Sequence, residues 1–135
     1  MGTGSSTTNP AAARVEAFSR KVREAYQNTC AFSGLSLING GGRPEVQAAH
    51  IRPVAERGPD SVRNGLALTG TIHWLFDRGL LAVGEDLGIL VSPQGVPDDL
   101  SRLLHPKHHL LLPVVPEQRP HPVFLAWHRE NVFKV

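Results

Sequence analysis

Three short motifs decide how this chain folds: QAAHIRP at 47–53, RNGLAL at 63–68 and IHWLFDRGL at 72–80. The first two contain short apolar runs that are typical of strands, and the Asn-Gly pair that opens the second is a turn signal. The third has apolar residues at helical spacing and ends at Gly79, a common stop for a helix. Together the motifs predict a strand, a long loop, a second strand and a helix.

Flanking elements are predicted from the same patterns. Apolar residues at three-to-four spacing indicate a helix at 11–27, before the motifs. Short apolar runs, turn residues and capping residues predict the remaining elements. These are strands at 30–32, 46–51 and 65–68, a helix from Thr69 or Thr71 to about Arg78, a hairpin of 80–83 with 88–92, and helices at 97–104 and 123–132. The expected core is Val22, Tyr26, Phe32, Leu66, Leu68, Leu75 and Phe76.

Length and composition favour one compact domain, because 135 residues with 41% apolar content can bury a single core. We expect a disordered leader at 1–10 and one domain at 11–135, with its motif core at 45–80 and a C-terminal extension at 93–135. No apolar run is long enough for a membrane helix, so no membrane partner is expected. A single cysteine, Cys30, excludes an internal disulfide and indicates a reducing, cytoplasmic setting.

Charge is nearly balanced, with a net charge of +2, but arginine is concentrated around the motifs. Lysine is absent between Arg43 and Arg78, and the arginine fork suits phosphate oxygens. A solvated loop surface is an equally good reading of this bias. If the surface grips a nucleic-acid backbone, the candidate DNA contacts are Arg52, Arg57, Arg63 and Arg78.

The histidines of the motifs suggest hydrolytic chemistry. His73 and Asp77 lie four residues apart, on one face of the predicted helix, so both can reach one metal ion. His50 ends the first strand, and a neutral imidazole is a suitable general base near neutral pH. Each of these residues also has a simpler interpretation. His50 is then a half-buried strand histidine, His73 and Asp77 are a hydrogen-bonded pair on a helix, and Asn64 belongs to an ordinary turn. The case for a site rests on their order and spacing together.

In that order and spacing, and in the flanking words AAHIRP, NGLAL and HWLFDRG, the chain resembles the HNH endonuclease family, in particular its restriction-type members. The resemblance covers residues 14–92 well. It implies an α+β fold with a ββα-metal (HNH, His-Me finger) core, flanking helices and a small additional hairpin. It also implies a metal-dependent endonuclease that hydrolyses phosphodiester bonds in DNA, in bacterial restriction or defence against foreign or modified DNA.

The resemblance implies roles for four residues. His50 matches the general base, and Asn64 matches the middle residue that fixes the loop and orients the base. His73 matches the last motif histidine, a metal ligand, and Asp77 occupies a position where many relatives supply another ligand. The expected cofactor is a divalent metal ion, magnesium or manganese first, with zinc or nickel as alternatives.

One departure concerns the ion. Many family members carry an aspartate or histidine ligand just before the base, and this chain has Ala49 there. The ion then has two protein ligands, or it also takes Gln47, which lies on the same strand face. A catalytically weak nucleic-acid-binding module that retains the HNH fold is therefore an alternative function, and a nonspecific toxin-type nuclease is another.

A second departure concerns structural zinc. Many members bind it with two cysteine pairs, and the matching positions here hold Cys30, Ser33, Thr69 and Ile72. We therefore expect no structural zinc. A histidine cluster at 105–109 permits metal binding, although a solvated turn is the better reading, and for His128 a structural role is preferred to a phosphate contact. The expected partners are DNA and a DNA-reading domain in a longer parent chain; target sequence and oligomeric state stay open.

Overall fold

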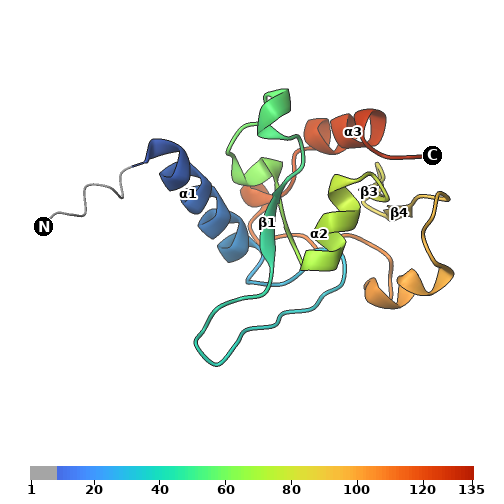
Figure 1. The fold of residues 1–135 in the computed structure, drawn as a ribbon, viewed down its shortest axis with the longest axis horizontal. Coiled ribbons are helices and arrows are strands. Elements are labelled where there is room, and N and C mark those ends of the chain that lie inside the picture. Colours follow the sequence, from blue (N-terminus) through green and yellow to red (C-terminus); the bar gives the residue numbers. More distant parts are fainter. Residues whose placement is uncertain (1–8) are drawn as a thin grey trace, which may run out of the picture.

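In the computed structural model, which describes residues 9–135, the three motifs form a strand–strand–helix core (Figure 1). Strand β1 (Gln47–His50) pairs antiparallel with β2 (Gly65–Leu68), with His50 opposite Gly65. Helix α2 (Gly70–Asp77) follows β2 at once. The predicted α+β fold with a ββα core is confirmed. Most of the predicted leader, residues 1–8, lies outside the described residues.

Helix α1 (Pro10–Ala25) covers one side of the β1–β2 hairpin, while α2 lies on the other side in Figure 1. The helix begins where the Asn9 side chain accepts hydrogen bonds from two backbone amides of the first turn. Phe18 and Val22 are buried against the hairpin. The approach is so close that a Cβ on Gly65 would lie 2.4 Å from Val22 Cγ2. The glycine of the second motif therefore lets α1 pack directly on β2.

The start of α2 is held by a residue from outside the motif. Thr69, one of the two predicted capping residues, occupies the N-cap position, but its side chain makes no capping hydrogen bond. Instead, Glu45 accepts a hydrogen bond from the Gly70 amide, at 3.0 Å between Oε2 and N. A carboxylate at a helix N-terminus is favourable because it faces unpaired amides. The helix ends as predicted, with Gly79 in the left-handed conformation at φ 75°.

The chain after α2 folds back over it. Strands β3 (Leu81–Val83) and β4 (Ile89–Val91) form the second antiparallel hairpin, and α3 (Pro122–Asn131) is the last helix. Near the C-terminus, the Lys134 amide donates to the Gly79 carbonyl at 2.9 Å. The predicted second hairpin and final helix are confirmed, and the tail packs against the end of the motif helix.

The predicted core is confirmed, because all seven residues named for it are buried. The strand predicted at 30–32 is wrong: these residues form a turn. Ala31 makes one backbone hydrogen bond with Ala67 and another with Leu111, but a bend at Gly34, with φ 80°, prevents a longer ladder. The helix predicted at 97–104 is a 3₁₀ helix at Asp98–Leu103. None of the described helices is long and apolar enough to cross a membrane.

His128 joins α3 to α2 and is almost fully buried, with 2% of its surface exposed. Its ring stacks on Phe76, with 3.8 Å between ring centroids, and its Nε2–H donates to the Phe76 carbonyl at 2.9 Å. Nδ1 has no hydrogen-bond partner among the described residues. Burial lowers the pKa of His128, and the nearby Arg129 lowers it further, although the Phe76 carbonyl and Asp77 oppose both effects. The burial supports the structural role and leaves no room for a phosphate contact.

Acid is therefore expected to destabilise this protein partly through His128. Because its pKa is lowered in the folded state, the unfolded chain binds the proton more readily. The stability from the neutral ring is present above the ordinary value of 6.5 and is lost as pH falls below it. The melting temperature should fall less between pH 7.5 and 5.5 for His128→Gln, which can still donate to Phe76. An equal fall in both proteins would contradict this assignment.

Candidate active site

His73 and Asp77 come together on α2, as their spacing predicts. His73 Nε2 lies 3.1 Å from Asp77 Oδ2. The other ring nitrogen, Nδ1, lies 2.6 Å from Oε1 of Gln47 on β1. Gln47 and Asp77 therefore contact opposite edges of one imidazole ring.

This arrangement assigns different tasks to the two neighbours of His73. An amide oxygen only accepts, so Gln47 takes its hydrogen bond from Nδ1–H, and an ion held between His73 and Asp77 would meet the lone pair of Nε2. Imidazole nitrogen and carboxylate oxygen fit a divalent ion that keeps several waters. In these side-chain conformations Gln47 lies at the wrong edge of the ring to be a third ligand to that ion. It suits the outer role of orienting a ligand histidine.

Within residues 9–135, no further histidine, cysteine, aspartate or glutamate takes the place of the ligand that Ala49 lacks. Ala49 is fully buried, and the residues that the structure describes contain no group of three histidine, cysteine, aspartate or glutamate side chains able to hold an ion. Cys30 is buried beside Thr69, with 3.9 Å between Sγ and Oγ1, and accepts a hydrogen bond from the Ser33 amide. Of the four positions that match the family's zinc-binding cysteines, three therefore lie side by side: Cys30, Ser33 and Thr69.

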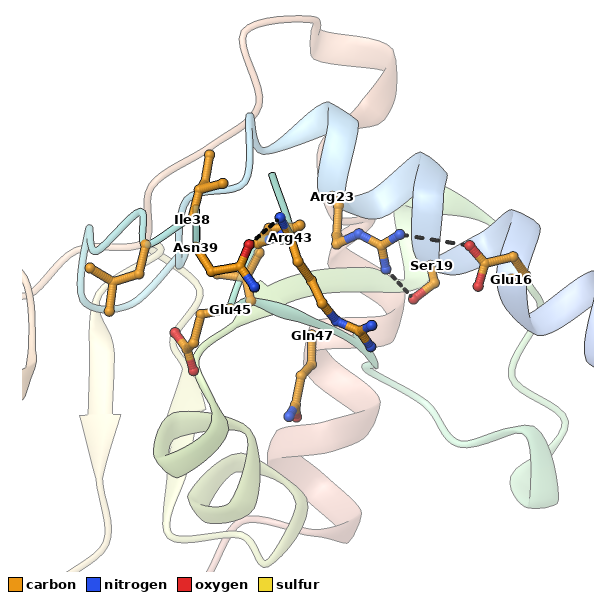
Figure 2. A pocket seen from close by; sticks show the side chains of 11 residues that line it. Glu16, Ser19, Arg23, Ile38, Asn39, Arg43, Glu45 and Gln47 are labelled. Atoms are coloured by element: carbon orange, nitrogen blue, oxygen red, sulfur yellow. Dashed lines mark hydrogen bonds and ion pairs between the residues drawn. The ribbon is translucent and has the colours of Figure 1, made fainter. Parts of the chain in front are cut away.

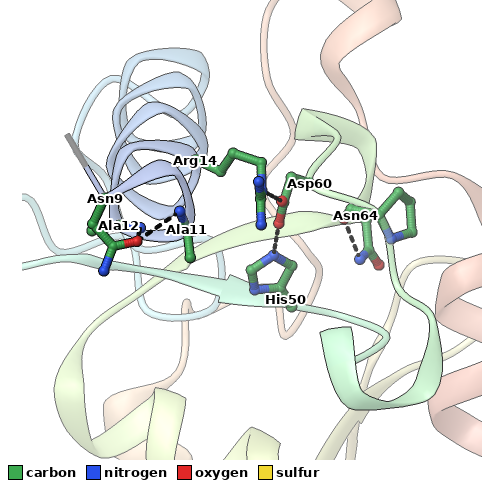
Figure 3. Close-up of polar contacts among 8 residues, drawn as sticks. Asn9, Ala11, Ala12, Arg14, His50, Asp60 and Asn64 are labelled. Carbon is green, nitrogen blue, oxygen red and sulfur yellow. Dashed lines mark hydrogen bonds and ion pairs between the residues drawn. The ribbon is translucent and has the colours of Figure 1, made fainter.

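His50, the predicted base, is half-buried at the end of β1. Its ring stacks on Phe18 of α1, with centroids 3.9 Å apart and planes 7° from parallel. Its Nε2 lies 2.8 Å from Oδ1 of Asp60, a contact that the sequence analysis missed (Figure 3). Arg14 on α1 approaches the other oxygen of Asp60 at 4.0 Å. No sequence signal singles out Asp60, because it is one of several charged residues in a long loop.

Asn64 is fully buried, and its side chain joins both ends of the loop that carries Asp60. Its oxygen accepts from the Arg52 amide at 2.9 Å, and its nitrogen donates to the carbonyls of Arg52 and Pro59 at 3.0 and 2.9 Å. The loop is tight enough that a Cβ on Gly58 would lie 1.7 Å from the Arg52 carbonyl oxygen. This geometry supports the loop-fixing role expected for Asn64.

The four candidate arginines fall into two groups. Two are tied to the protein: Arg52 Nε donates to the Glu56 carbonyl at 2.6 Å and its guanidinium lies over Trp127, while Arg63 Nε donates to the Arg119 carbonyl at 2.9 Å. Arg57 and Arg78 are exposed. The guanidinium of Arg78 lies 4.2 Å from the ring centroid of Trp74, which is also exposed, and its Nη1 donates a long hydrogen bond of 3.5 Å to the Trp74 carbonyl. Arg57 and Arg78 are thus better placed than the other two to meet a phosphate.

A cleft of about 870 Å³ lies between α1 and the segment at 37–47 (Figure 2). Arg23 in its wall is held by Ser19, at 2.8 Å between Nη1 and Oγ, and Arg43 points its guanidinium toward the same space. Gln47 lines this cleft and also contacts His73. The cleft therefore borders the candidate metal ligands.

Two histidines of the cluster at 105–109 contact backbone groups, one within the cluster and one in the turn between β3 and β4. His105 Nδ1 accepts from the Lys107 amide at 3.2 Å, and His109 Nε2 lies 2.9 Å from the Asp86 carbonyl. His108 is exposed in the left-handed conformation. These contacts support the reading of the cluster as a turn.

Comparison with known proteins gives a family-model match and a similar solved structure. Residues 30–84, which contain β1, β2, α2 and β3, match the family model described as HNH endonuclease. Among solved structures, the fold is similar to one titled "Modification dependent TagI restriction endonuclease", with a TM-score of 0.68 and 24% sequence identity. The match covers 86% of this chain and 37% of that one, so this chain spans well under half of the larger protein. No protein with a curated description matches this chain in sequence.

Proposed function

We propose that this chain is a metal-dependent endonuclease that hydrolyses phosphodiester bonds in DNA, because residues 30–84 match the family model described as HNH endonuclease. The observation that carries the proposal is the contact of His73 Nε2 with Asp77 on α2, next to a strand that ends in His50. The first pair has the chemistry of a metal site, and the second histidine has that of a base.

His73 and Asp77 would hold the ion, and Gln47 would orient His73 through Nδ1. A bound divalent ion supplies charge stabilisation for the phosphoryl oxygens and for the departing 3′ oxygen. His50 takes the proton of the attacking water, because a neutral imidazole accepts a proton near neutral pH. Asn64 keeps the loop beside His50 in place. Water attack with loss of the 3′ oxygen leaves 5′-phosphate and 3′-hydroxyl ends.

The biological setting we propose is bacterial restriction or defence. The similar solved protein is described as a modification-dependent restriction endonuclease, and this chain matches 37% of its length. We therefore propose that the chain works with a DNA-reading domain in a longer parent protein, in the cytoplasm.

A catalytically weak nucleic-acid-binding module is the second candidate, and Ala49 is the observation that favours it. A buried methyl group stands where many relatives place a ligand, which leaves His73 and Asp77 as the two protein ligands. Magnesium is commonly held by one or two carboxylates with several waters, so two ligands do not exclude catalysis. The two functions differ in whether any bond is broken.

The test of the proposed reaction is the chemistry of the ends. End-labelled duplex oligonucleotides incubated with the protein and manganese should yield fragments that a ligase rejoins without prior kinase treatment. That outcome requires a 5′-phosphate beside a 3′-hydroxyl. Fragments with 3′-phosphate ends would overturn the proposed mechanism, and bound but uncut DNA would favour the binding module.

DNA binding by the isolated domain should be weak, salt-sensitive and poorly specific for sequence. Exposed arginines on a loop and at a helix end suit phosphates better than base edges. Arg57→Gln and Arg78→Gln should each weaken binding to unrelated duplexes alike and reduce the salt slope by about one ion. Glutamine avoids adding strain at Arg57, which already has φ 68°. Fluorescence anisotropy at several salt concentrations measures this.

Arg102→Gln is the matched control, because Arg102 is exposed on the 3₁₀ helix outside the motifs. Its removal takes away the same charge and should leave the salt slope almost unchanged. Equal losses in all three variants would mean that net charge alone governs binding. A single strongly preferred cleavage site for the isolated chain would contradict the expected lack of specificity.

A further inference from the structure

The contact between His50 and Asp60 fixes which nitrogen of the candidate base carries a hydrogen. Oδ1 of Asp60 lies 2.8 Å from Nε2 of His50, and an ionised carboxylate only accepts hydrogen bonds. In the neutral imidazole one nitrogen is a donor and the other an acceptor, so a donor at Nε2 leaves the lone pair on Nδ1. The contact therefore selects one of the two tautomers.

Nδ1 of His50 is available to a water molecule. It has no hydrogen-bond partner in the described part of the chain. Within that part, the one buried side-chain nitrogen or oxygen without a partner is Nδ1 of His128, so Nδ1 of His50 is not sealed in the interior. Stacking on Phe18 restricts the plane of the ring. The ring is thus held by its face and by one nitrogen, while the other nitrogen stays open.

The position of Asp60 comes from the loop and not from an ion pair. Asn64 binds the carbonyl of Pro59, the residue just before Asp60, and the next residue, Ser61, accepts a hydrogen bond from the Arg63 amide. By contrast, Arg14 is 4.0 Å from Asp60 and mostly exposed, so solvent weakens that pair. Asn64 therefore acts on His50 through the loop that carries Asp60.

We propose that Asp60 is a positioning residue that holds His50 with its hydrogen on Nε2, so that Nδ1 takes the proton from the attacking water. The proposal rests on the proposed nuclease function of the same site. The charged groups that face this histidine are Asp60 from the loop and, behind it, Arg14 from α1. Phe18 and Gly65, its other neighbours on α1 and β2, carry no charge.

The proton step balances without a further reactant. A water O–H bond breaks as its oxygen forms a bond to phosphorus, and the proton moves to Nδ1. The bond from phosphorus to the 3′ oxygen breaks, and that oxygen takes a proton from solvent. His50 is then a cation with hydrogens on both nitrogens, and the Asp60 carboxylate stabilises it through Nε2–H, as the carboxylate of a catalytic triad does. Loss of the Nδ1 proton to solvent restores the base.

The test is Asp60→Asn, which keeps the shape of the side chain but can also donate to Nε2 and so favour the wrong tautomer. We expect kcat to fall by at least about tenfold, up to the roughly 10²–10⁴-fold expected for complete loss of a general base. KM and the melting temperature should stay near their wild-type values. Asp99→Asn, an exposed carboxylate on the 3₁₀ helix, is the matched control and should leave kcat unchanged.

Nitrogen-15 NMR of the histidine rings provides a readout that needs no DNA. In the wild type, the neutral His50 ring, identified by its absence in His50→Ala, should carry its hydrogen on Nε2. In Asp60→Asn a detectable share should move to Nδ1. A hydrogen on Nδ1 in the wild type, or a wild-type kcat in Asp60→Asn, would overturn the proposal. If the wild type cuts no DNA, the proposed function fails, while the spectra still decide whether Asp60 sets the tautomer.

Discussion

Cleavage of DNA by His50→Ala is expected to be about 10²–10⁴-fold slower than by the wild type, the usual effect of removing a positioned general base. The ring is held for this role by its stacking on Phe18 and its contact with Asp60. Because His50 contacts neither His73 nor Asp77 in the described structure, manganese affinity should be nearly unchanged. Initial rates of nicking at saturating manganese measure the effect.

His108→Asn serves as the control for removing a histidine. His108 is exposed in the left-handed conformation, which asparagine also tolerates. Its variant should cut DNA at the wild-type rate. The melting temperature of His50→Ala must also be measured, because losing a stacked ring weakens packing against α1. A folded His50→Ala protein that cuts DNA at close to the wild-type rate would remove this residue from the reaction.

Loss of either candidate ligand should weaken metal binding and cleavage together. His73→Ala and Asp77→Ala each remove one of two protein ligands, so manganese affinity should fall by more than the roughly 10–100-fold seen for outer partners of a metal ligand. In Gln47→Ala the loss of manganese affinity should lie within that smaller range, because Gln47 contacts His73 Nδ1 and not the side of the ring that faces Asp77. Calorimetric titration with manganese ranks the three variants.

Thr71→Ala is the matched control on the same helix, since Thr71 is exposed and belongs to neither contact. It should bind manganese as the wild type does. Wild-type affinity in both His73→Ala and Asp77→Ala would show that the ligands are elsewhere, and the histidine cluster at 105–109 would be tested next. A Gln47→Ala protein as weak as Asp77→Ala would make Gln47 a ligand after all.

The elements of the core could be predicted because their signals are local. Short apolar runs and an Asn-Gly turn mark the hairpin, whose second strand has the predicted bounds Gly65–Leu68. Helical spacing and Gly79 set α2. The pairing of His73 with Asp77 follows from the same spacing, since residues four apart share one helical face.

The contacts between distant segments could not be predicted in the same way. Asp60 reaches His50 only because a loop closed by Asn64 bends back, and nothing in the loop sequence marks which carboxylate does so. Glu45 replaces Thr69 at the start of α2 for the same reason. The sequence also does not predict that His128 is buried against Phe76, because this contact depends on how α3 packs.

The number of arginines near the motifs does not predict which of them are free to contact DNA. The sequence predicts that four arginines near the motifs face DNA, yet Arg52 and Arg63, and over a longer distance Arg78, donate to backbone carbonyls of the protein itself. A guanidinium offers five donors, so it satisfies loop carbonyls as readily as phosphates. Sequence alone does not separate these uses, and DNA contact by Arg57 and Arg78 stays a prediction.

Nicking of supercoiled plasmid, with manganese or magnesium and with EDTA, tests the central claim most directly. We predict conversion to open-circular and linear DNA by the wild type with the metal, and none with EDTA. Within one preparation, His50→Ala and Asp77→Ala should both be defective while Thr71→Ala is active. Undiminished cleavage in EDTA, or DNA that is bound but never cut with any divalent ion, would contradict a metal-dependent nuclease built on these residues.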